Sequence, residues 1–247
     1  MLSKNDIKLI RSLTQGKYRK KHSLFIVEGG KIIREFHKHG TEFERLFYLD
    51  GAEIPEGLNG EVIKAKELGQ ISQLSTPNDS LALIKLPDQN RVEVKKVGKK
   101  LMLACEKVQD PGNMGTIIRI ADWFGIDDLV CSPDCADVYS GKVVQASMGS
   151  LARVRVSYQD LTELINALKA EDKTYPIVTS SLKGQNIFSS NLPERGMVVL
   201  GNESKGVSGK IQDRSDLLLK IPSFGGAESL NVAVSAGIIL AEFRRRS

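Results

Sequence analysis

The chain has 247 residues, which is enough to bury a core in one large domain or two modest ones, and we expect two. It carries 35 Lys and Arg residues against 30 Asp and Glu, a net charge of +5, and this mild cationic bias suits a polyanionic partner. Three cysteines are too few for a disulfide framework and no uncharged run approaches the roughly 18 residues of a membrane span, which excludes a disulfide-rich secreted protein and a membrane protein.

The first predicted elements lie between residues 24 and 86, where short apolar runs alternate with helix-like sequence. Four runs predict strands: residues 24–29, 45–51, 61–65 and 80–86. The stretch GKIIREFHKHG, residues 30–40, predicts a helix after the first of them. Strands interleaved with helices indicate an α/β unit.

A basic run precedes these elements. Four cations in the stretch GKYRKKHS stand close together: Lys17, Arg19, Lys20 and Lys21. From the residues alone these four cations are candidate phosphate contacts, because clustered cations are the usual electrostatic footprint of nucleic-acid binding. A solvated surface run with no partner is the alternative.

The stretch PDQNRVEVKKVGKK, residues 87–100, is typical of a linker, since it is polar, charged and broken by Pro and Gly. We place the boundary near Arg91. The predicted organisation is a first domain over residues 1–91, a linker over 92–100 and a second domain over 101–247.

The second domain contains runs that are apolar along nearly their whole length: residues 100–106, 127–132, 175–181, 196–203 and 217–223. Helix-like stretches separate them: residues 116–125, 141–149 and 161–170. Strands that are apolar throughout are buried on both faces, which predicts a parallel sheet between helices. Ligands of such sheets lie at the carboxyl ends of the strands, where the polar and glycine-rich segments of this chain fall.

One such segment, GNESKGVS at residues 201–208, nearly fits the phosphate-binding loop of nucleoside triphosphatases. It fails because Val207 stands where that loop needs its lysine. The dinucleotide-binding pattern G-x-G-x-x-G is absent throughout, so an adenosine cofactor needs another mode of binding. A strand followed by Gly and Glu still indicates a bend at a pocket with one carboxylate, Glu203, and an exposed turn residue is the alternative.

Residues 108–125, VQDPGNMGTIIRIADWFG, predict a Pro-Gly turn, then Asn113, then a helix. Arg119 projects away from the apolar stripe of that helix. An arginine near the carboxyl edge of a sheet is well placed to hold a phosphate or a carboxylate with its planar fork. A salt bridge to Asp122 is the alternative role.

The stretch FGGAESLNVAVSAG, residues 224–237, places three polar side chains before an apolar helix: Glu228, Ser229 and Asn231. Ser229 or Asn231 can cap that helix, and the basic end of the chain suits its carboxyl terminus. Capping alone does not account for all three groups, so this segment is a third candidate for the site.

Three segments together, residues 110–125, 198–208 and 221–243, resemble in order and spacing the three motifs of the SpoU/TrmH family of RNA 2′-O-ribose methyltransferases, within the SPOUT superfamily. The resemblance spans most of residues 98–247. It implies a fold of the α/β class: a SPOUT domain with a mostly parallel sheet and a deep trefoil knot, which is a rare exception to unknotted topology.

Residues 24–36 and 76–85 resemble the small substrate-binding domain, similar to ribosomal protein L30e, that precedes the catalytic domain in many members of the family. The fold class therefore includes a small L30e-like α/β domain at the N-terminus. Where the family often has TPQG, this chain has TPND.

The resemblance also implies the cofactor, the assembly and the site. The family binds S-adenosylmethionine in a bent form, largely through backbone groups, and its active sites form across a homodimer interface. By motif position the invariant polar set falls on Asn113, Arg119, Glu203, Ser229 and Asn231. Cofactor contacts fall on Thr179, Leu200, Gly201, Ile221, Ser229 and Leu230.

The reaction implied is methyl transfer from S-adenosylmethionine to a ribose 2′-hydroxyl, and no metal is expected. Arg119 would clamp a phosphate, with proton acceptance as the secondary role, because free guanidinium has a pKa above about 12 and keeps its proton far above neutral pH. Asn113 and Glu203 would orient Arg119 and the substrate, while Ser229 and Asn231 shape the pocket.

Ribosomal RNA is the expected substrate, since L30e-like modules bind structured RNA, and transfer RNA is the alternative. A catalytically silent RNA-binding protein of the same fold and an enzyme that methylates a base nitrogen are the competing functions. Cys131 and Cys135 have no histidine nearby, so a zinc site is not favoured. We expect a cytoplasmic enzyme.

Overall fold

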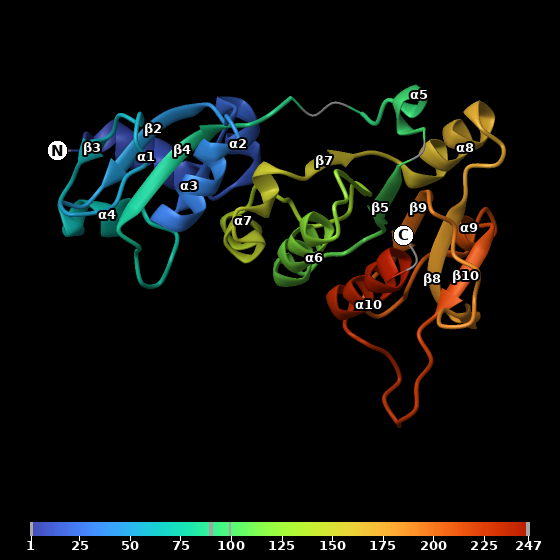
Figure 1. Ribbon diagram of the computed structural model, residues 1–247. Coiled ribbons are helices and arrows are strands. Elements are labelled where there is room, and N and C mark those ends of the chain that lie inside the picture. The colour runs from blue at the N-terminus through green and yellow to red at the C-terminus, as the bar shows by residue number, and fades with distance from the viewer. Residues whose placement is uncertain (1, 89–90, 99, 246–247) are drawn as a thin grey trace. The chain divides into compact units, whose positions relative to one another are not determined.

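The computed structural model describes residues 2–88, 91–98 and 100–245 (Figure 1). The chain folds into two compact units. The first unit is drawn from Met1–Asp88 and Asp137–Arg153, and the second from Gln89–Ala136 and Val154–Ser247. Assignment of the segment Asp137–Arg153 to the first unit was not anticipated from the sequence.

The first unit is built on a four-stranded sheet of order β1-β4-β2-β3. Its strands are β1 (Leu24–Glu28), β2 (Phe43–Tyr48), β3 (Glu61–Val62) and β4 (Ser80–Lys85). Strand β4 pairs antiparallel with β1 and with β2, while β3 joins β2 in parallel. These strands and the helix α3 (Gly30–Lys38) confirm the elements predicted from residues 24–86.

Helices pack against this sheet through alternate strand residues. Ile26 and Phe47 share one buried cluster with side chains of α1 (Lys4–Ser12) and α4 (Ala65–Ile71). Phe25 is the neighbour of Ile26, and it contacts Phe36 of α3 with ring centroids 5.7 Å apart. Neighbouring strand residues face opposite sides of a sheet, so α3 lies on the other face.

The segment Asp137–Arg153 contains α7 (Gly141–Ser147) and a 3-10 turn at Ser150–Ala152. Helix α7 contacts β1. Gln145 Nε2 donates to the backbone oxygen of Glu28 at 2.8 Å, and the Tyr139 ring lies 5.0 Å from that of Phe25. Both apolar packing and hydrogen bonds therefore attach this segment to the first unit.

The second unit is built on a six-stranded sheet of order β10-β8-β9-β5-β6-β7, and every pairing in it is parallel. The strands are β5 (Leu101–Cys105), β6 (Asp128–Cys131), β7 (Arg155–Tyr158), β8 (Ile177–Asn186), β9 (Gly196–Leu200) and β10 (Leu217–Lys220). All residues of the central strands β5 and β9 are buried. The predicted parallel sheet is confirmed, and its central strands are buried as expected, whereas β8 is exposed over much of its second half and β10 is only partly buried.

Helices cover both faces of this sheet. On one face, Met102 and Val130 pack with side chains of α5 (Val94–Val97), α8 (Leu161–Glu171) and α9 (Gly209–Gln212). On the other face, the Cys131 sulfur lies 4.0 Å from that of Met114 in α6 (Pro111–Trp123). Helix α6 packs against α10 (Val232–Arg245), as Figure 1 shows.

Strand order fixes where a site can form. The chain runs from β5 outward through β6 and β7, then returns to place β9 on the other side of β5. The loops after β5 and β9 therefore diverge at a switch point, which is where doubly wound sheets bind ligands. No helix among the described residues is long and apolar enough to cross a membrane.

Candidate active site

Three loops at the carboxyl edge of the second sheet form the candidate site. They follow β5, β9 and β10, and they carry the three segments that the sequence singled out. Two of these strands, β5 and β9, are neighbours at the switch point. Parallel pairing brings their carboxyl ends to the same edge, so side chains distant in sequence can meet there.

Asn113 is held at the start of α6. Asp110 caps this helix, since its Oδ1 accepts a hydrogen bond from the backbone N–H of Asn113 at 2.7 Å. Pro111 occupies the first turn, where its missing N–H costs nothing. The predicted Pro-Gly turn before the helix is therefore wrong, because Pro111 and Gly112 are already helical. Asn113 lies in the first turn of the helix.

A continuous chain of hydrogen bonds joins the three loops. Asn231 Oδ1 accepts from the backbone N–H groups of Ala233 and Val234 at 2.9 and 3.2 Å, which caps α10. Its Nδ2 therefore faces outward and donates to Asn113 Oδ1 at 2.8 Å. The amide of Asn113 is oriented in turn, and its Nδ2 donates to Glu203 Oε1 at 3.0 Å. We call these three side chains the Asn231–Asn113–Glu203 chain.

The β9 loop presents Glu203 through a local turn. Asn202 and Gly206 form an antiparallel bridge, and Asn202 Oδ1 accepts the backbone N–H groups of Ser204 and Lys205. Asn202 Nδ2 donates to the backbone oxygen of Lys107 at 2.9 Å and contacts Glu203 Oε2 at 3.3 Å. The turn thus fixes both the loop and the second oxygen of the carboxylate.

Glu106 is a buried carboxylate that the sequence interpretation missed. It follows β5 directly, is 7% exposed, and its Oε2 accepts the backbone N–H of Ser208 at 2.6 Å. The signal in the sequence was a carboxylate directly after an apolar run that predicts a buried strand. Its role is to join the end of β5 to the start of α9.

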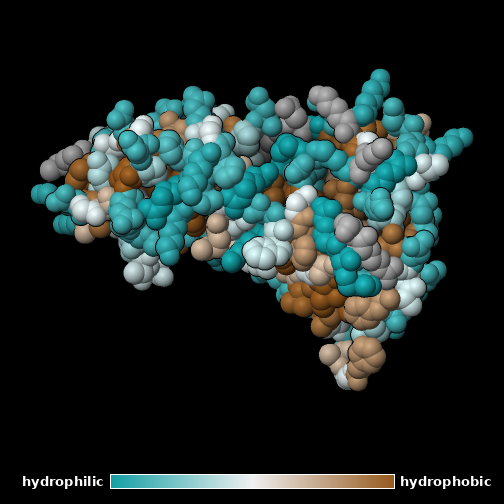
Figure 2. Space-filling model, viewed as in Figure 1, coloured by the Kyte–Doolittle hydropathy of each residue, from teal (hydrophilic) through white to brown (hydrophobic). Residues whose placement is uncertain are grey.

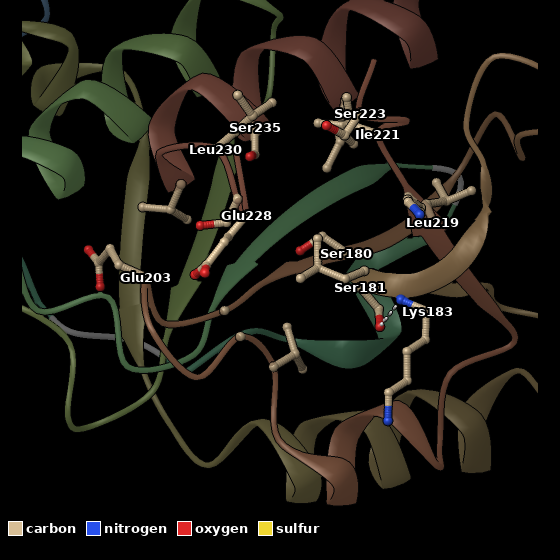
Figure 3. Close-up of a pocket in the computed structure, with 18 of the residues that line it drawn as sticks. Ser180, Ser181, Lys183, Glu203, Leu219, Ile221, Ser223, Glu228, Leu230 and Ser235 are labelled. Atoms are coloured by element: carbon tan, nitrogen blue, oxygen red, sulfur yellow. Dashed lines mark hydrogen bonds between the residues drawn. The ribbon is translucent and has the colours of Figure 1, made fainter. Parts of the chain in front are cut away.

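An open cavity of about 810 Å³ lies beside Glu203 and is lined by residues of β8, β10, the loops after β9 and β10, and the helices α9 and α10. Figure 3 shows Ser180 and Ser181 of β8 on one side and Glu203 across from them, with Ile221 and Leu230 above. Pockets of about 300–1,000 Å³ hold ligands of cofactor size. The cavity has the size and the mixed polarity that a nucleoside cofactor needs.

Four of the six residues predicted to contact the cofactor line this cavity: Gly201, Ile221, Ser229 and Leu230. Thr179 and Leu200 are fully buried and do not line it. The Thr179 hydroxyl is instead 2.7 Å from that of Ser215. Lining residues that the prediction omitted include Ser180, Ser181, Lys183, Lys205, Gln212, Lys220 and Ser235.

Gly201 is required by close approach of two backbone segments. A Cβ atom there would lie 2.2 Å from the backbone carbon of Gly206. Any side chain at this position would displace the loop that carries Glu203.

Two predicted catalytic residues stand apart from the Asn231–Asn113–Glu203 chain. Arg119 is exposed on α6 and does not line the cavity, and its guanidinium has no hydrogen bond or ion pair with another described residue. The alternative salt bridge to Asp122 is therefore not formed. Ser229 is exposed and lines the cavity, but it does not cap α10, since Asn231 does.

The SpoU rRNA Methylase family matches residues 100–241, more than half of the chain and all three loops of the site. The chain belongs to the SpoU rRNA methylase family. An MRM3-like substrate binding domain matches residues 4–82, ahead of it. The predicted family, its class of enzyme and the presence of a substrate-binding domain are confirmed.

Relatives of this SpoU methylase include enzymes of similar length. The Bacillus subtilis 23S rRNA (guanosine(2553)-2′-O)-methyltransferase RlmP is 30% identical over 239 residues, which cover 95% of this chain and 94% of the relative. The Streptomyces viridochromogenes 23S rRNA (uridine(2479)-2′-O)-methyltransferase is 28% identical over 240 residues, covering 90% and 83%.

Solved structures agree with the predicted fold class. A TrmH-family protein from Porphyromonas gingivalis is 36% identical, with a TM-score of 0.88 over the whole of both chains. An AdoMet-bound rRNA methyltransferase from Sinorhizobium meliloti is 25% identical, with a TM-score of 0.84 over 100% of this chain and 97% of that one. The predicted cofactor, S-adenosylmethionine (AdoMet), is thus confirmed for the family.

The basic run lies within residues 4–82, which match the substrate binding domain. Its four cations differ in how far they are exposed. Arg19 is 4% exposed and donates to the backbone oxygens of Leu13 and Thr14 and to Asp137 Oδ2, at 2.7, 2.9 and 2.6 Å. Its guanidinium holds the first unit together and is not accessible to an RNA phosphate. The other three cations are not buried: Lys17, Lys20 and Lys21.

The three cysteines gather at the ends of β5 and β6. No cluster of three or more His, Cys, Asp or Glu side chains suited to a metal occurs in the described part of the chain. Cys135 Sγ donates to the backbone oxygen of Cys105 at 3.2 Å. A hydrogen bond from the Cys131 thiol lowers the pKa of Cys135 to about 7, although burial opposes this shift. Burial raises the pKa of Cys105 well above its usual value.

Proposed function

We propose that this SpoU methylase transfers the methyl group of S-adenosylmethionine to the 2′-hydroxyl of a ribose in ribosomal RNA. The observation that carries the proposal is the Asn231–Asn113–Glu203 chain, which joins all three family segments beside a cavity of cofactor size. Ribosomal RNA is favoured over transfer RNA because the Bacillus subtilis relative, aligned over nearly the whole chain, acts on 23S rRNA.

The cavity fits the proposed cofactor. Leu219, Ile221 and Leu230 supply apolar surface for an adenine ring, and Glu203 and Glu228 supply carboxylates that suit a cationic ligand. When bound, the cofactor supplies a methyl group activated by a positively charged sulfur. The remaining work of the protein is to bind, to orient the ribose and to assist loss of its proton.

The proposed roles follow from these positions. Glu203 is held by Asn113 and Asn202, so its carboxylate is fixed at the cavity wall. Ser229 lies next to Leu230 in that wall and would contact the cofactor. Arg119 would clamp a phosphate next to the target ribose, since an exposed guanidinium with no partner among the described residues is available for a bidentate contact. Proton acceptance by Arg119 is the secondary role.

A homodimer would bring Arg119 to a pocket. Arg119 lies on α6, outside the cavity of its own chain. The same helix exposes Trp123 at 84%, and α10 exposes Val234 at 51%. Figure 2 shows apolar side chains gathered over α10 and beside the loop that precedes it. Pairing through this apolar face would cover it and place Arg119 beside the partner's cavity.

The path of the chain at β8 and β10 is compatible with the trefoil knot that we propose for this domain. The β8–β10 pairing shifts register between Leu218 and Leu219. At the shift, residues 180–184 of β8 have no partner residue in β10, and most of them line the cavity. A Cβ atom at Gly184 would lie 2.5 Å from the backbone of Leu218, so the two segments are in close contact there.

We propose that residues 1–91 bind the RNA substrate and that 101–247 catalyse the reaction, joined by residues 92–100. Lys17, Lys20 and Lys21 are the proposed phosphate contacts of the first domain, and Arg19 is left out because its guanidinium is buried. The proposed location is the cytoplasm, where bacterial ribosomes are assembled from their RNA.

The test is methylation of unmodified 23S rRNA, 16S rRNA and transfer RNA by the purified chain with labelled S-adenosylmethionine. Nuclease digestion and mass spectrometry then place the methyl group on a ribose or a base. We expect 2′-O-methylated nucleosides from ribosomal RNA only. A methylated base, a transfer RNA product, or no binding of S-adenosylmethionine by calorimetry would each overturn the proposal.

A further inference from the structure

An exposed aromatic side chain stands at the mouth of the cavity. Phe224 lies in the loop between β10 and α10 and is 93% exposed, although it lines the cavity. Gly225 and Gly226 follow it, and a Cβ atom at either would have no neighbour within 4 Å. Figure 1 shows this loop protruding beyond α10. The ring leaves apolar surface in water, and a partner that covers it would gain the free energy of burying that surface.

Three lysines from three different elements line the same cavity. Lys183 belongs to β8, Lys205 to the β9 loop and Lys220 to β10. Within the described ranges, none of their ammonium groups forms a hydrogen bond or an ion pair. Figure 3 shows Lys183 on the side of the cavity opposite Glu203, so this cation and this carboxylate are separated.

Against Glu203 and Glu228, which line the same cavity, the three lysines leave an excess of one positive charge. S-adenosylmethionine has one carboxylate and two positive groups, so it does not match three ammonium groups. A polyanion that crosses the mouth of the cavity does match them. Lysines that follow a backbone, combined with an aromatic face, are the arrangement by which proteins hold unpaired nucleic acid.

We propose that Phe224 stacks on an unpaired base of the RNA substrate next to the methylated ribose, and that Lys183, Lys205 and Lys220 contact the flanking phosphates. The inference rests on the proposed function and specifies its substrate as an unpaired segment. A base drawn out of its helix loses stacking with its neighbours, and an aromatic ring replaces that contact.

The first experiment measures binding of a fluorescein-labelled 12-nucleotide RNA of mixed sequence, as a single strand and as a duplex. We expect the protein to prefer the single strand. Phe224→Ala should weaken single-strand binding by about 5- to 150-fold, which corresponds to about 1–3 kcal/mol of stacking. Phe224→Trp should restore it, and Phe224→Leu should not, because leucine has no aromatic face. Phe188→Ala removes a half-exposed aromatic outside the cavity and should have no effect.

The second experiment measures how affinity depends on salt. Replacing the three lysines with glutamine should reduce the slope of log affinity against log salt by about 2, since each phosphate contact in single-stranded RNA contributes about 0.7. Phe224→Ala should leave the slope unchanged, because stacking releases no counterions. An unchanged slope in the lysine variant would overturn their role.

Several results would overturn the role of Phe224. Full binding by Phe224→Leu would show that only apolar contact matters. A shift to monomer in Phe224→Ala, by sedimentation, would assign the ring to a second copy of the chain, and a more than threefold loss of S-adenosylmethionine affinity would assign it to the cofactor. The binding assays contain no cofactor, so they can fail while the wild-type protein still methylates ribosomal RNA, which separates this inference from the proposed function.

Discussion

Asn231 has two structural roles that substitution can separate. Its Oδ1 caps α10, and its Nδ2 donates to Asn113. Asn231→Ser keeps a cap, because serine is as good an N-terminal cap as asparagine, and removes the donor to Asn113. Asn231→Ala removes both. The difference in stability between the two variants therefore measures the cap of α10. The effect of Asn231→Ser alone measures the hydrogen bond to Asn113.

The expected magnitudes follow from the two interactions. A hydrogen bond between neutral groups contributes about 0.5–1.5 kcal/mol and a helix cap about 0.5–2 kcal/mol. For chains of this size, 1 kcal/mol corresponds to about 2–4 °C in Tm. We expect Asn231→Ser to lower Tm by about 2–4 °C and Asn231→Ala by about 4–8 °C, measured by circular dichroism.

Activity should respond differently from stability. Without the donor of Asn231, the amide of Asn113 is free to rotate away from Glu203, so both variants should lose about tenfold or more in methyl-transfer rate. Ser3→Ala is a matched control, since Ser3 caps α1 in the other unit by accepting the backbone N–H of Asp6 at 3.1 Å. It should lower Tm by about 2–4 °C with activity unchanged.

Two results would refute this reasoning. If the Tm values of the serine and alanine variants agree within about 1 °C, Asn231 is not an effective cap. If Asn231→Ser retains the full rate of methyl transfer, the bridge to Asn113 does not orient the site.

Other regions of the molecule give further predictions. Arg119→Ala should reduce methyl transfer by about 100-fold or more while the affinity for S-adenosylmethionine, measured by calorimetry, stays within about twofold; a fully active variant would remove Arg119 from the mechanism. Trp123→Asp should convert the proposed dimer to monomer in sedimentation experiments, because a carboxylate cannot be buried unpaired in an apolar interface; a stable dimer of this variant would exclude that face. Alkylation of Cys135 by iodoacetamide should be half-maximal near pH 7, since the thiol below this pH is protonated and the thiolate above it reacts; a midpoint near 9, or equal labelling of Cys131, would contradict the assigned environment.

Periodicity and composition predicted the parts of the fold that depend on local sequence. The fully apolar runs at residues 101–105 and 196–200 became the two central strands, because only buried strands tolerate apolar residues on both faces. Short elements were missed: the sequence interpretation proposed no strand at Arg155–Tyr158 and no helix at Gly209–Gln212. These segments are short, and tertiary contacts decide their structure.

The site shows the same limit more sharply. The residue types were visible in the sequence, but the orientation of Asn113 depends on Glu203 and Asn231, which lie 90 and 118 residues away. The sequence analysis took Arg19 as an exposed phosphate contact, and the structure buries it for the same reason. A basic run identifies exposed cations by its pattern, whereas the pairing of Arg19 with Asp137, 118 residues away, is decided only by folding.

The helix α7 packs on β1 although its sequence lies between β6 and β7. The boundary between the units is therefore crossed three times by the chain, near residues 88, 136 and 153. A truncation that starts after residue 91 would leave Val143 and Val144, now buried, without the strand they pack against. Domain-deletion experiments on this protein should for that reason use point substitutions or retain the first sheet, since loss of solubility would otherwise be mistaken for loss of substrate recognition.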